Sequence, residues 1–306
     1  MEIIVGKYAG FCYGVNRAVE GLDKAICDEN NRSNSNNSNN KSINNQVQCY
    51  GEIVHNNNVI NYFKNKGVEF IDDLSKVDKR KKLVLRAHGV RKEDYNYLKN
   101  NGIEYKDFTC HNVLKVHNIV ESNKDNLIIL TGDKNHPENI GTISFGENII
   151  VINDPSELND INIMEKIVKS DKNKVVLVSQ TTYSMEKFLI IEKLLKNILK
   201  NTDKDFITYK TICSSTKFRQ LETEEIAKKV ELMIIIGSNI SSNTKKLKEI
   251  AEKYTKTIMI ENIDDLEGID LPNKIGITAG ASAPKSIIDD IVKILKGDTK
   301  VRGNTK

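Results

Sequence analysis

The chain has 306 residues, a formal net charge of +4 and 39% hydrophobic residues. This length exceeds one ordinary domain and leaves room for two or three small domains that share a cleft. No stretch approaches the roughly 20 apolar residues of a membrane-spanning helix, and the first residues do not resemble a signal peptide. We therefore expect a cytoplasmic protein without a membrane partner. Nucleic acid is not an expected partner either, because the chain lacks Trp and any dense basic stripe.

An asparagine-rich segment interrupts the first part of the chain. Residues 30–46 read NNRSNSNNSNNKSINNQ, which is polar and of low complexity. Such a segment buries too little apolar surface to order itself. We predict a disordered surface loop inserted between a helix and a strand.

The rest of the chain alternates short apolar runs with longer amphipathic ones. The runs lack strict alternation of polar and apolar residues, which is typical of strands buried on both faces of a parallel sheet. An apolar face over residues 185–200 predicts a helix with Phe188, Leu189 and Leu195 among its buried residues. Strand followed by helix, repeated, predicts an α/β fold with parallel sheets. The main strand candidates are residues 82–86, 127–130, 175–178, 232–236, 257–260 and 274–277.

Five cysteines in a cytoplasmic chain argue against a disulfide framework. Cys27 continues an apolar helical pattern, and Cys49 lies in a short strand-like run. Free cysteines commonly behave as small buried hydrophobes, so we expect these two to be structural. Cys12, Cys110 and Cys213 differ, because each follows a strand-like segment and precedes a helical one.

These three cysteines lie about 100 residues apart, the length of a small domain. We therefore predict three similar α/β units, each of which contributes one cysteine from a strand-to-helix turn. The strand at the start of the chain would then complete the last unit. The predicted units are residues 14–109 with the insertion, 110–208, and 209–300 together with 1–13.

Polar side chains follow the predicted strands at the ends where parallel sheets bind ligands. Each of them has a plain explanation as a turn residue, a helix cap or a solvated carboxylate. Three of the five histidines lie at such strand ends, as do the three cysteines, and this coincidence indicates a site for a small anion. His111 and His117 lie on the helical segment after Cys110, where we expect packing or surface roles.

Three single thiols from three units suit few cofactors. Zinc sites usually contain locally paired cysteines, and so do redox disulfides, but this chain has no such pair. A cubane iron–sulfur cluster with one iron left open by the protein fits the pattern. The open iron could act as a Lewis acid, and the cluster could deliver electrons.

Nine motifs occur in the same order as in the LytB family of 4-hydroxy-3-methylbut-2-enyl diphosphate reductases, which the chain resembles from residue 10 to about 285. The motifs are residues 10–15, 54–56, 87–90, 109–117, 136–142 and 180–182, Cys213 with Arg219 and Gln220, and residues 241–243 and 278–284. The resemblance implies three α/β units around a central cluster. It also implies that the chain catalyses the last step of the non-mevalonate isoprenoid pathway. In this step an allylic alcohol diphosphate is reductively dehydroxylated to isopentenyl and dimethylallyl diphosphates.

Residue roles follow from the same resemblance. It implies that Cys12, Cys110 and Cys213 hold one [4Fe-4S] cluster. Glu138 is then the proton source, with Thr181 beside it and His136 nearby. The side chains expected to bind the substrate and its diphosphate are His55, His88, His136, Thr181, Thr182, Ser241, Ser242, Asn243 and Ser282. A donor such as flavodoxin or ferredoxin is the implied source of electrons.

The chain departs from the family pattern at His111, where members commonly have Pro, and at Ile240, where members often have Asn. Neither departure touches an implied ligand. Other functions remain open on the residues alone: a cluster dehydratase without net electron transfer, a non-enzymatic cluster sensor, or an α/β nucleotide-binding protein. Against the nucleotide-binding alternative, this chain has no G-x-G-x-x-G motif after its first strand.

Overall fold

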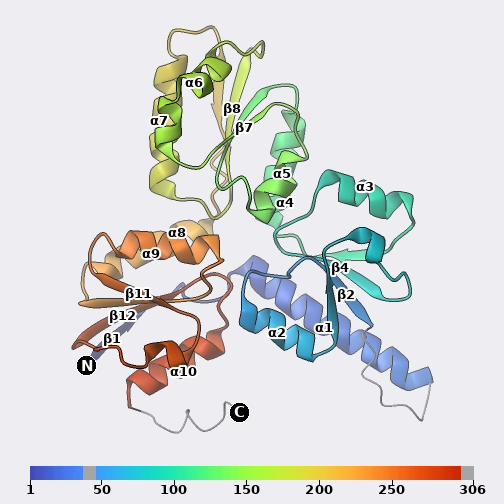
Figure 1. Cartoon of the computed structure of the whole chain (residues 1–306), viewed down its shortest axis with the longest axis vertical. Helices are drawn as coiled ribbons and strands as arrows, with labels where there is room; N and C mark the ends of the chain where they lie inside the picture. The colour runs from blue at the N-terminus through green and yellow to red at the C-terminus, as the bar shows by residue number, and fades with distance from the viewer. Residues whose placement is uncertain (37–45, 298–306) are drawn as a thin grey trace. The chain divides into compact units, whose positions relative to one another are not determined.

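The computed structural model describes residues 1–36 and 46–297, and it contains three parallel four-stranded sheets (Figure 1). One sheet has the order β3-β2-β4-β5, with strands Val68–Ile71, Val47–Tyr50, Lys82–Leu85 and Tyr105–Asp107. Another has the order β7-β6-β8-β9, with strands Ile149–Ile152, Leu127–Thr131, Lys174–Ser179 and Asp205–Thr208. The remaining sheet has the order β11-β10-β12-β1, with strands Lys256–Ile260, Leu232–Ile236, Lys274–Ala279 and Glu2–Val5.

All three sheets have the same topology, because in each the second strand lies outside the first and the third and fourth follow on the other side. The last sheet obtains its fourth strand from the start of the chain: Glu2 pairs with Lys274 and Val5 with Ile277. The predicted α/β class with parallel sheets is confirmed, and so is the expectation that the N-terminal strand completes the last sheet. The predicted boundaries of the three units stay a prediction.

Helices connect the strands. The α-helices are α1 (Tyr13–Asn36), α2 (Asn57–Asn65), α3 (Lys92–Asn100), α4 (His111–Ser122), α5 (Pro137–Ile143), α6 (Ile161–Val168), α7 (Met185–Leu199), α8 (Ser214–Ala227), α9 (Ser242–Ala251) and α10 (Lys285–Leu295). Three short 3-10 helices cover Leu74–Lys76, Pro155–Asn159 and Ile263–Leu266. By its contacts the chain divides into two compact units, one of residues 1–16, 54–61 and 214–306, and the other of residues 17–53 and 62–213.

Continuous apolar strands arise here because both sheet faces are covered. In β6, Leu127 and Ile129 pack with α7, whereas Ile128 and Leu130 pack with α4. In the sheet that contains β10, α8 and α9 lie on one face and α10 on the other (Figure 1). Alternate side chains of one strand therefore enter two different cores, and every position must be apolar.

The six main strand candidates are all present, and their ends differ from prediction by at most two residues. The predicted helix at 185–200 is α7, but Leu189 is 47% exposed and Ile191 is fully buried in its place. The buried residues Phe188, Ile191, Leu195 and Leu199 recur every three or four positions, so Leu189 lies outside the stripe that faces the core.

Two further expectations are wrong. Helix α1 continues to Asn36, into the segment for which we expected a loop, because a helix already nucleated adds polar residues at little cost. The rest of that prediction, at residues 37–45, lies outside the described residues. Cys27 is exposed rather than buried, while Cys49 is buried as expected.

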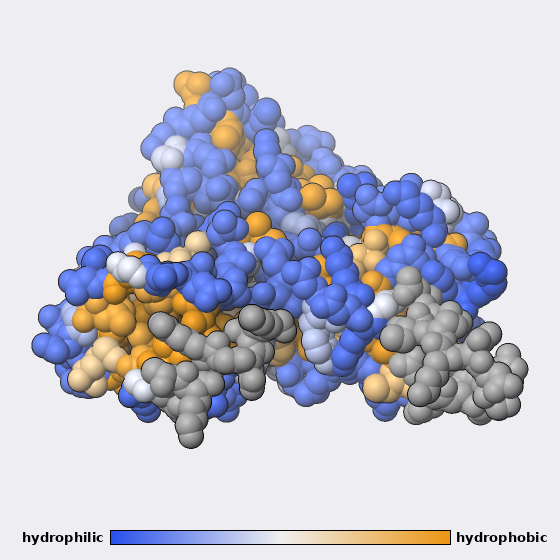
Figure 2. Space-filling view, turned by 60° about the horizontal axis from the view of Figure 1, so that its bottom comes forward, coloured by the Kyte–Doolittle hydropathy of each residue, from blue (hydrophilic) through white to orange (hydrophobic). Residues whose placement is uncertain are grey.

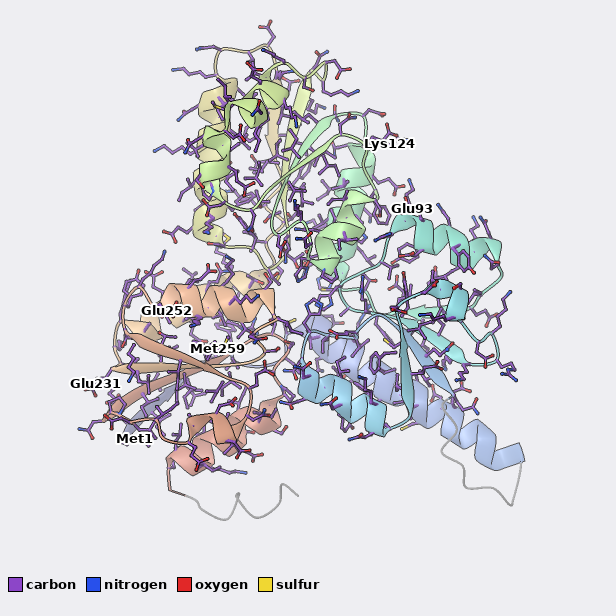
Figure 3. The ribbon with its side chains drawn as sticks, viewed as in Figure 1. Met1, Glu93, Lys124, Glu231, Glu252 and Met259 are labelled. Carbon is purple, nitrogen blue, oxygen red and sulfur yellow. The ribbon has the colours of Figure 1, made fainter. Side chains whose placement is uncertain are left out.

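Polar groups cover much of the surface. Hydrophilic side chains predominate on the face seen in Figure 2, with smaller hydrophobic areas between them. Charged side chains such as Glu93, Lys124 and Glu252 are exposed (Figure 3). Among the described helices, none has the length and hydropathy needed to cross a membrane.

His117 is a histidine inside the core. Its side chain is 1% exposed and its ring stacks on Phe145 at a centroid distance of 4.4 Å. Within the described residues, neither ring nitrogen finds a hydrogen-bond partner. Burial lowers the pKa of His117 to about 4, so the ring stays neutral at physiological pH. The expected packing role of His117 is therefore supported, and His111 on the same helix is exposed.

This burial predicts a loss of stability in acid. Below a pH of about 6.5 the unfolded chain protonates His117, but the folded chain does not until the pH approaches about 4. The penalty therefore grows as pH falls through this window and reaches about 2 kcal/mol near pH 5. Urea unfolding of wild type and His117→Gln from pH 7 to 5 should show a smaller loss in the variant. The exposed His111→Gln is the control, and equal losses in wild type and His117→Gln would contradict the assignment.

Candidate functional site

The shared topology places two loops side by side at the carboxyl edge of each sheet. In an order of 2-1-3-4, the crossover connections diverge between the first and third strands, and ligands bind at this switch point. Every expected substrate-binding residue follows one of these strands: β2, β4, β6, β8, β10 or β12. In chain order they are His55, His88, His136, Thr181 with Thr182, Ser241 to Asn243, and Ser282.

Each of the three expected cluster cysteines follows the fourth strand of a sheet and directly precedes a helix. Cys12 precedes α1, Cys110 is the N-cap residue of α4, and Cys213 precedes α8. All three are half-buried, and none is in a disulfide. Each of the three cysteines therefore lies at the N-terminal end of a helix.

The cysteine amides share a hydrogen-bond pattern that the sequence did not reveal. Cys12 N–H donates to the Ala281 carbonyl at 3.3 Å, Cys110 N–H to Ala87 at 2.9 Å, and Cys213 N–H to Thr181 at 3.0 Å. Each acceptor lies in the loop after the third strand of the same sheet. These loops also carry Ser282, His88 and Thr181, so every cysteine is tied to a loop with an expected substrate-binding residue.

Glu138 is a carboxyl buried without a basic partner in the described contacts. Its side chain is 2% exposed and lies in the first turn of α5. Thr181 donates to it twice, from its backbone N–H to Oε1 at 2.6 Å and from its hydroxyl to Oε2 at 2.9 Å. Burial raises the pKa of Glu138 to about 7, and the Thr181 hydrogen bonds oppose this rise. The group can therefore hold and release a proton near neutral pH.

Thr181 connects this carboxyl to Cys213. Its side chain and N–H contact Glu138, and its carbonyl accepts the Cys213 N–H at 3.0 Å. A single residue, Thr181, thus links a protonatable carboxyl to the backbone of Cys213. Sequence spacing alone could not show this, because the contact joins three different loops.

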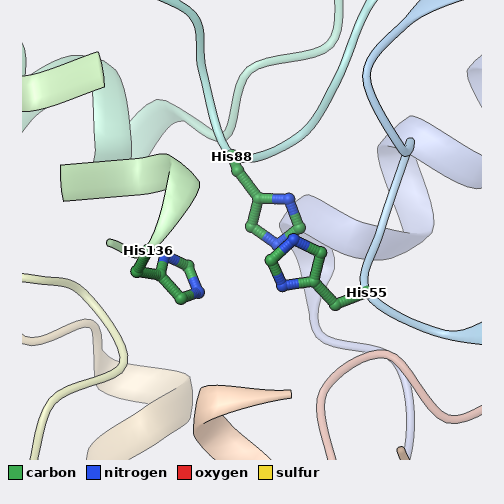
Figure 4. Close-up of side chains that lie close together, drawn as sticks. All are labelled: His55, His88 and His136. Atoms are coloured by element: carbon green, nitrogen blue, oxygen red, sulfur yellow. The ribbon is translucent and has the colours of Figure 1, made fainter. Parts of the chain in front are cut away.

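His136 and His88 lie next to each other in the same unit (Figure 4), with ring centroids 5.6 Å apart and nearly perpendicular planes. His136 is 8% exposed and is the N-cap residue of α5. Its Nδ1 accepts the Glu138 N–H at 3.1 Å, so the neutral ring carries its proton on Nε2. This nitrogen is then a donor, which suits an anionic ligand.

Gln180 and Asn139, for which the sequence predicts no individual role, fix the loop before α5. The Asn139 amide donates to the Asp133 carbonyl at 2.8 Å and to Gln180 Oε1 at 3.2 Å. Gly132 has a φ of 144°, and a Cβ there would lie 2.5 Å from Asn139 Nδ2 and 2.6 Å from Gln180 Oε1. Glycine at position 132 therefore lets the two amides approach the backbone. The signal in the sequence was that Asn139 and Gln180, two polar residues, follow the apolar strands β6 and β8.

The unit that contains β10 carries a second group of expected residues. Ser241 is the N-cap residue of α9, and its hydroxyl accepts the Thr244 N–H at 3.3 Å. Asn243 is 3% exposed, and neither atom of its amide has a hydrogen-bond partner among the described residues. An amide buried in this way is costly unless a ligand satisfies it. Ser282 donates to the His55 carbonyl at 3.1 Å, so these two residues adjoin.

The fold and the site define a class of protein: an α/β protein of three topologically equal parallel sheets, with single cysteines, a protonatable buried carboxyl and unpaired polar groups at the sheet edges. A profile of the family described as LytB protein matches residues 3–296. The chain belongs to this family.

Relatives of this chain are named 4-hydroxy-3-methylbut-2-enyl diphosphate reductase. The protein from Thermoanaerobacter sp. (strain X514) is 38% identical, with 97% of this chain and 99% of that protein covered. The protein from Helicobacter pylori (strain P12) is 37% identical, with coverages of 95% and 97%.

Solved structures are similar as well. The E-1-hydroxy-2-methyl-but-2-enyl-4-diphosphate reductase from Plasmodium falciparum has a TM-score of 0.81 at 29% identity, covering 97% of this chain and 89% of its own. A structure of (E)-4-hydroxy-3-methyl-but-2-enyl diphosphate reductase, described as the terminal enzyme of the non-mevalonate pathway, has a TM-score of 0.64 at 30% identity. The match covers 97% of this chain and 99% of the chain in that structure.

The hydroxyl of Thr181 should control the pKa of Glu138. Thr181→Val keeps the shape of the side chain and the backbone donor but removes one hydrogen bond to the carboxylate. The pKa of Glu138 should then rise further, by roughly one pH unit, since the lost bond favours the charged form. Infrared titration of the carboxyl band, with Glu138→Gln as the blank, measures this change. An unchanged or lower pKa would show that the hydroxyl does not stabilise the carboxylate.

Proposed function

We propose that this chain catalyses the reductive dehydroxylation of 4-hydroxy-3-methylbut-2-enyl diphosphate to isopentenyl and dimethylallyl diphosphates, the last step of the non-mevalonate isoprenoid pathway. The names of its relatives support the reaction. The observation that carries the proposal is the Glu138 carboxyl, buried and with a pKa of about 7, beside Thr181 and the Cys213 loop. The reaction breaks a C–O bond and uses two electrons and two protons, and oxygen leaves as water.

The residues present fit one [4Fe-4S] cluster held by Cys12, Cys110 and Cys213. Thiols are the usual protein ligands of such clusters, and these three are half-buried single residues without disulfide partners. The Asn112 amide lies 4.0 Å from Cys110 Sγ, where it can donate to a thiolate. When bound, the cluster supplies electrons and an open iron for the substrate hydroxyl.

Proton delivery is the task of Glu138. An alcohol is a poor leaving group and departs readily only after it gains a proton. Half of the Glu138 side chains carry a proton when the pH equals their pKa, which is about 7. Thr181 holds both carboxyl oxygens, so it fixes the direction from which the proton is offered. We assign Glu138 as the general acid, Thr181 as the residue that orients it, and His136 as a nearby group that completes the first turn of α5.

Diphosphate binding is assigned to the polar side chains at the three switch points. His136 Nε2 and His88 supply imidazole donors, and Thr181 and Thr182 supply hydroxyls. Asn243 supplies a buried amide without another partner in the described structure. The full set also contains His55, Ser241, Ser242 and Ser282. Such donors can bind a diphosphate without a P-loop.

Electrons must come from outside the chain. A one-electron carrier such as flavodoxin or ferredoxin, acting twice, fits the stoichiometry. A dehydratase that uses the cluster only as a Lewis acid remains the second candidate, because the same thiols and carboxyl would serve it. Turnover that depends on a reduced donor separates the two reactions.

Glu138→Gln should abolish most turnover and leave the cluster intact. The amide keeps the volume and can still contact Thr181, but it cannot donate a proton to the leaving oxygen. We expect kcat to fall by roughly 10²- to 10⁴-fold, the usual contribution of a general acid. Anaerobic assays with reduced donor and the allylic diphosphate measure the rate, and visible absorbance measures the cluster.

The matched control for this change is the exposed Glu147→Gln, which should retain wild-type turnover. Near-wild-type turnover in Glu138→Gln would remove Glu138 from the mechanism. Loss of the cluster absorbance in that variant would instead assign Glu138 a structural role.

Asn243→Asp should weaken diphosphate binding. The change places a negative charge of nearly the same size at a buried position, where we propose that a diphosphate oxygen lies. Affinity for inorganic pyrophosphate should fall at least tenfold, on the order of 1.4 kcal/mol or more. Isothermal titration of the full chain measures it, with Asn239→Asp in the exposed part of the same loop as the control. Equal affinities for the two variants would exclude Asn243 from the binding site.

A further inference from the structure

The loop between β1 and Cys12 has little regular structure of its own, yet several of its backbone groups are hydrogen-bonded. Gly6 N–H donates to the Ile277 carbonyl at 2.8 Å, and Ala9 N–H donates to Gly6 at 3.2 Å. At its far end Cys12 N–H donates to Ala281. Two side chains of α8, Glu222 and Arg219, bind four further backbone groups of the loop.

Glu222 binds the loop through two amides. Its Oε1 accepts the Lys7 N–H at 2.7 Å, and its Oε2 accepts the Tyr8 N–H at 3.0 Å. Two adjacent peptide donors on one carboxylate form a charge-assisted pair, which is stronger than neutral hydrogen bonds. A Cβ at position 6 would lie 2.7 Å from Glu222 Oε2, so Gly6 leaves the room that this approach requires.

Arg219 binds the same loop through two carbonyls. Its Nε donates to the Tyr8 carbonyl at 2.9 Å, and its Nη2 donates to the Gly10 carbonyl at 2.9 Å. The side chain is only 2% exposed. A planar guanidinium can bind two acceptors in fixed directions, which lysine cannot do. Gly10 has a φ of 97°, a conformation that places its carbonyl toward Arg219 at no steric cost.

These contacts join two of the three cysteine segments. Helix α8 begins at Ser214, directly after Cys213, and its Arg219 and Glu222 hold the peptides that lead to Cys12. The four bonds span more than 200 residues of sequence. No role in substrate or proton chemistry is assigned to either side chain.

We propose that Arg219 and Glu222 form a clamp that positions the Cys12 thiolate for the cluster, an inference that rests on the proposed function for the cluster itself. The two are positioning residues, because they act through the loop and not on the substrate. Without the clamp, the loop opens more often and Cys12 leaves its place as a ligand. The expected consequences are local exposure of the Cys12 thiol and faster loss of the cluster.

The test compares Glu222→Gln with Glu225→Gln, an exposed glutamate on the same helix. In the full chain without cluster, alkylation of each cysteine is followed by peptide mass spectrometry. Glu222→Gln should speed alkylation of Cys12 on the order of tenfold, since a charge-assisted pair is lost. Cys110 should react at its wild-type rate, and the exposed Cys27 serves as an internal standard.

Reconstituted protein provides the second readout. Glu222→Gln should lose its visible cluster absorbance in air on the order of tenfold faster than wild type, and Glu225→Gln should match wild type. Arg219→Lys, which keeps the charge but not the fork, should behave like Glu222→Gln. Should Glu222→Gln fail to fold, Gly6→Ala tests the same contact, because a methyl group there displaces the Glu222 carboxylate without mutating either clamp residue.

Equal alkylation of Cys12 in wild type and the clamp variants would overturn the proposal. So would an increase of the same size at Cys110, since that would show general destabilisation. If wild type binds no iron, the proposed function fails, but the alkylation rates still decide whether the clamp positions Cys12.

Discussion

The proposed reaction depends on one buried carboxyl, Glu138, whose two oxygens accept hydrogen bonds from Thr181. A carboxyl with little access to water and no cation among its described contacts resists ionisation, so its proton remains available near neutral pH. The rest of the unit holds this arrangement in place. His136 caps α5 and fixes the Glu138 backbone, and the Thr181 carbonyl binds the Cys213 amide. The Glu138 carboxyl and the Cys213 backbone are therefore both bound by a single residue, Thr181.

The repeated topology explains how a chain without local cysteine pairs places one cysteine at the equivalent point of each sheet. Each sheet places its first and third strands in the centre and its fourth at an edge. The central strands supply polar loops, and the fourth supplies a cysteine whose amide is tied to one of those loops. Membership of the LytB family agrees with this plan. The same plan assigns the two tasks of the proposed reaction, anion binding and metal binding, to different strand ends.

The α/β fold and the positions of the three cysteines were predictable from the sequence. Apolar runs indicated the strands because parallel sheets require apolar residues on both faces, and the cysteines were correctly placed between strand and helix. The exposure of Leu189 and Cys27 was not predictable, since it depends on which helix face meets the core. The raised pKa of Glu138 arises from burial, which no local pattern encodes. The contacts of Arg219 and Glu222 join segments more than 200 residues apart, so only the folded chain reveals them.

The central claim is that a cluster held by three cysteines and a protonated Glu138 together reduce an allylic diphosphate. The most direct measurement is anaerobic turnover of the reconstituted full chain with a reduced one-electron donor, combined with iron and sulfide analysis. The account predicts about four irons per chain and release of both isopentenyl and dimethylallyl diphosphates, in amounts that follow the electrons consumed. Absence of bound iron, or conversion of the substrate without consumption of electrons, would contradict it.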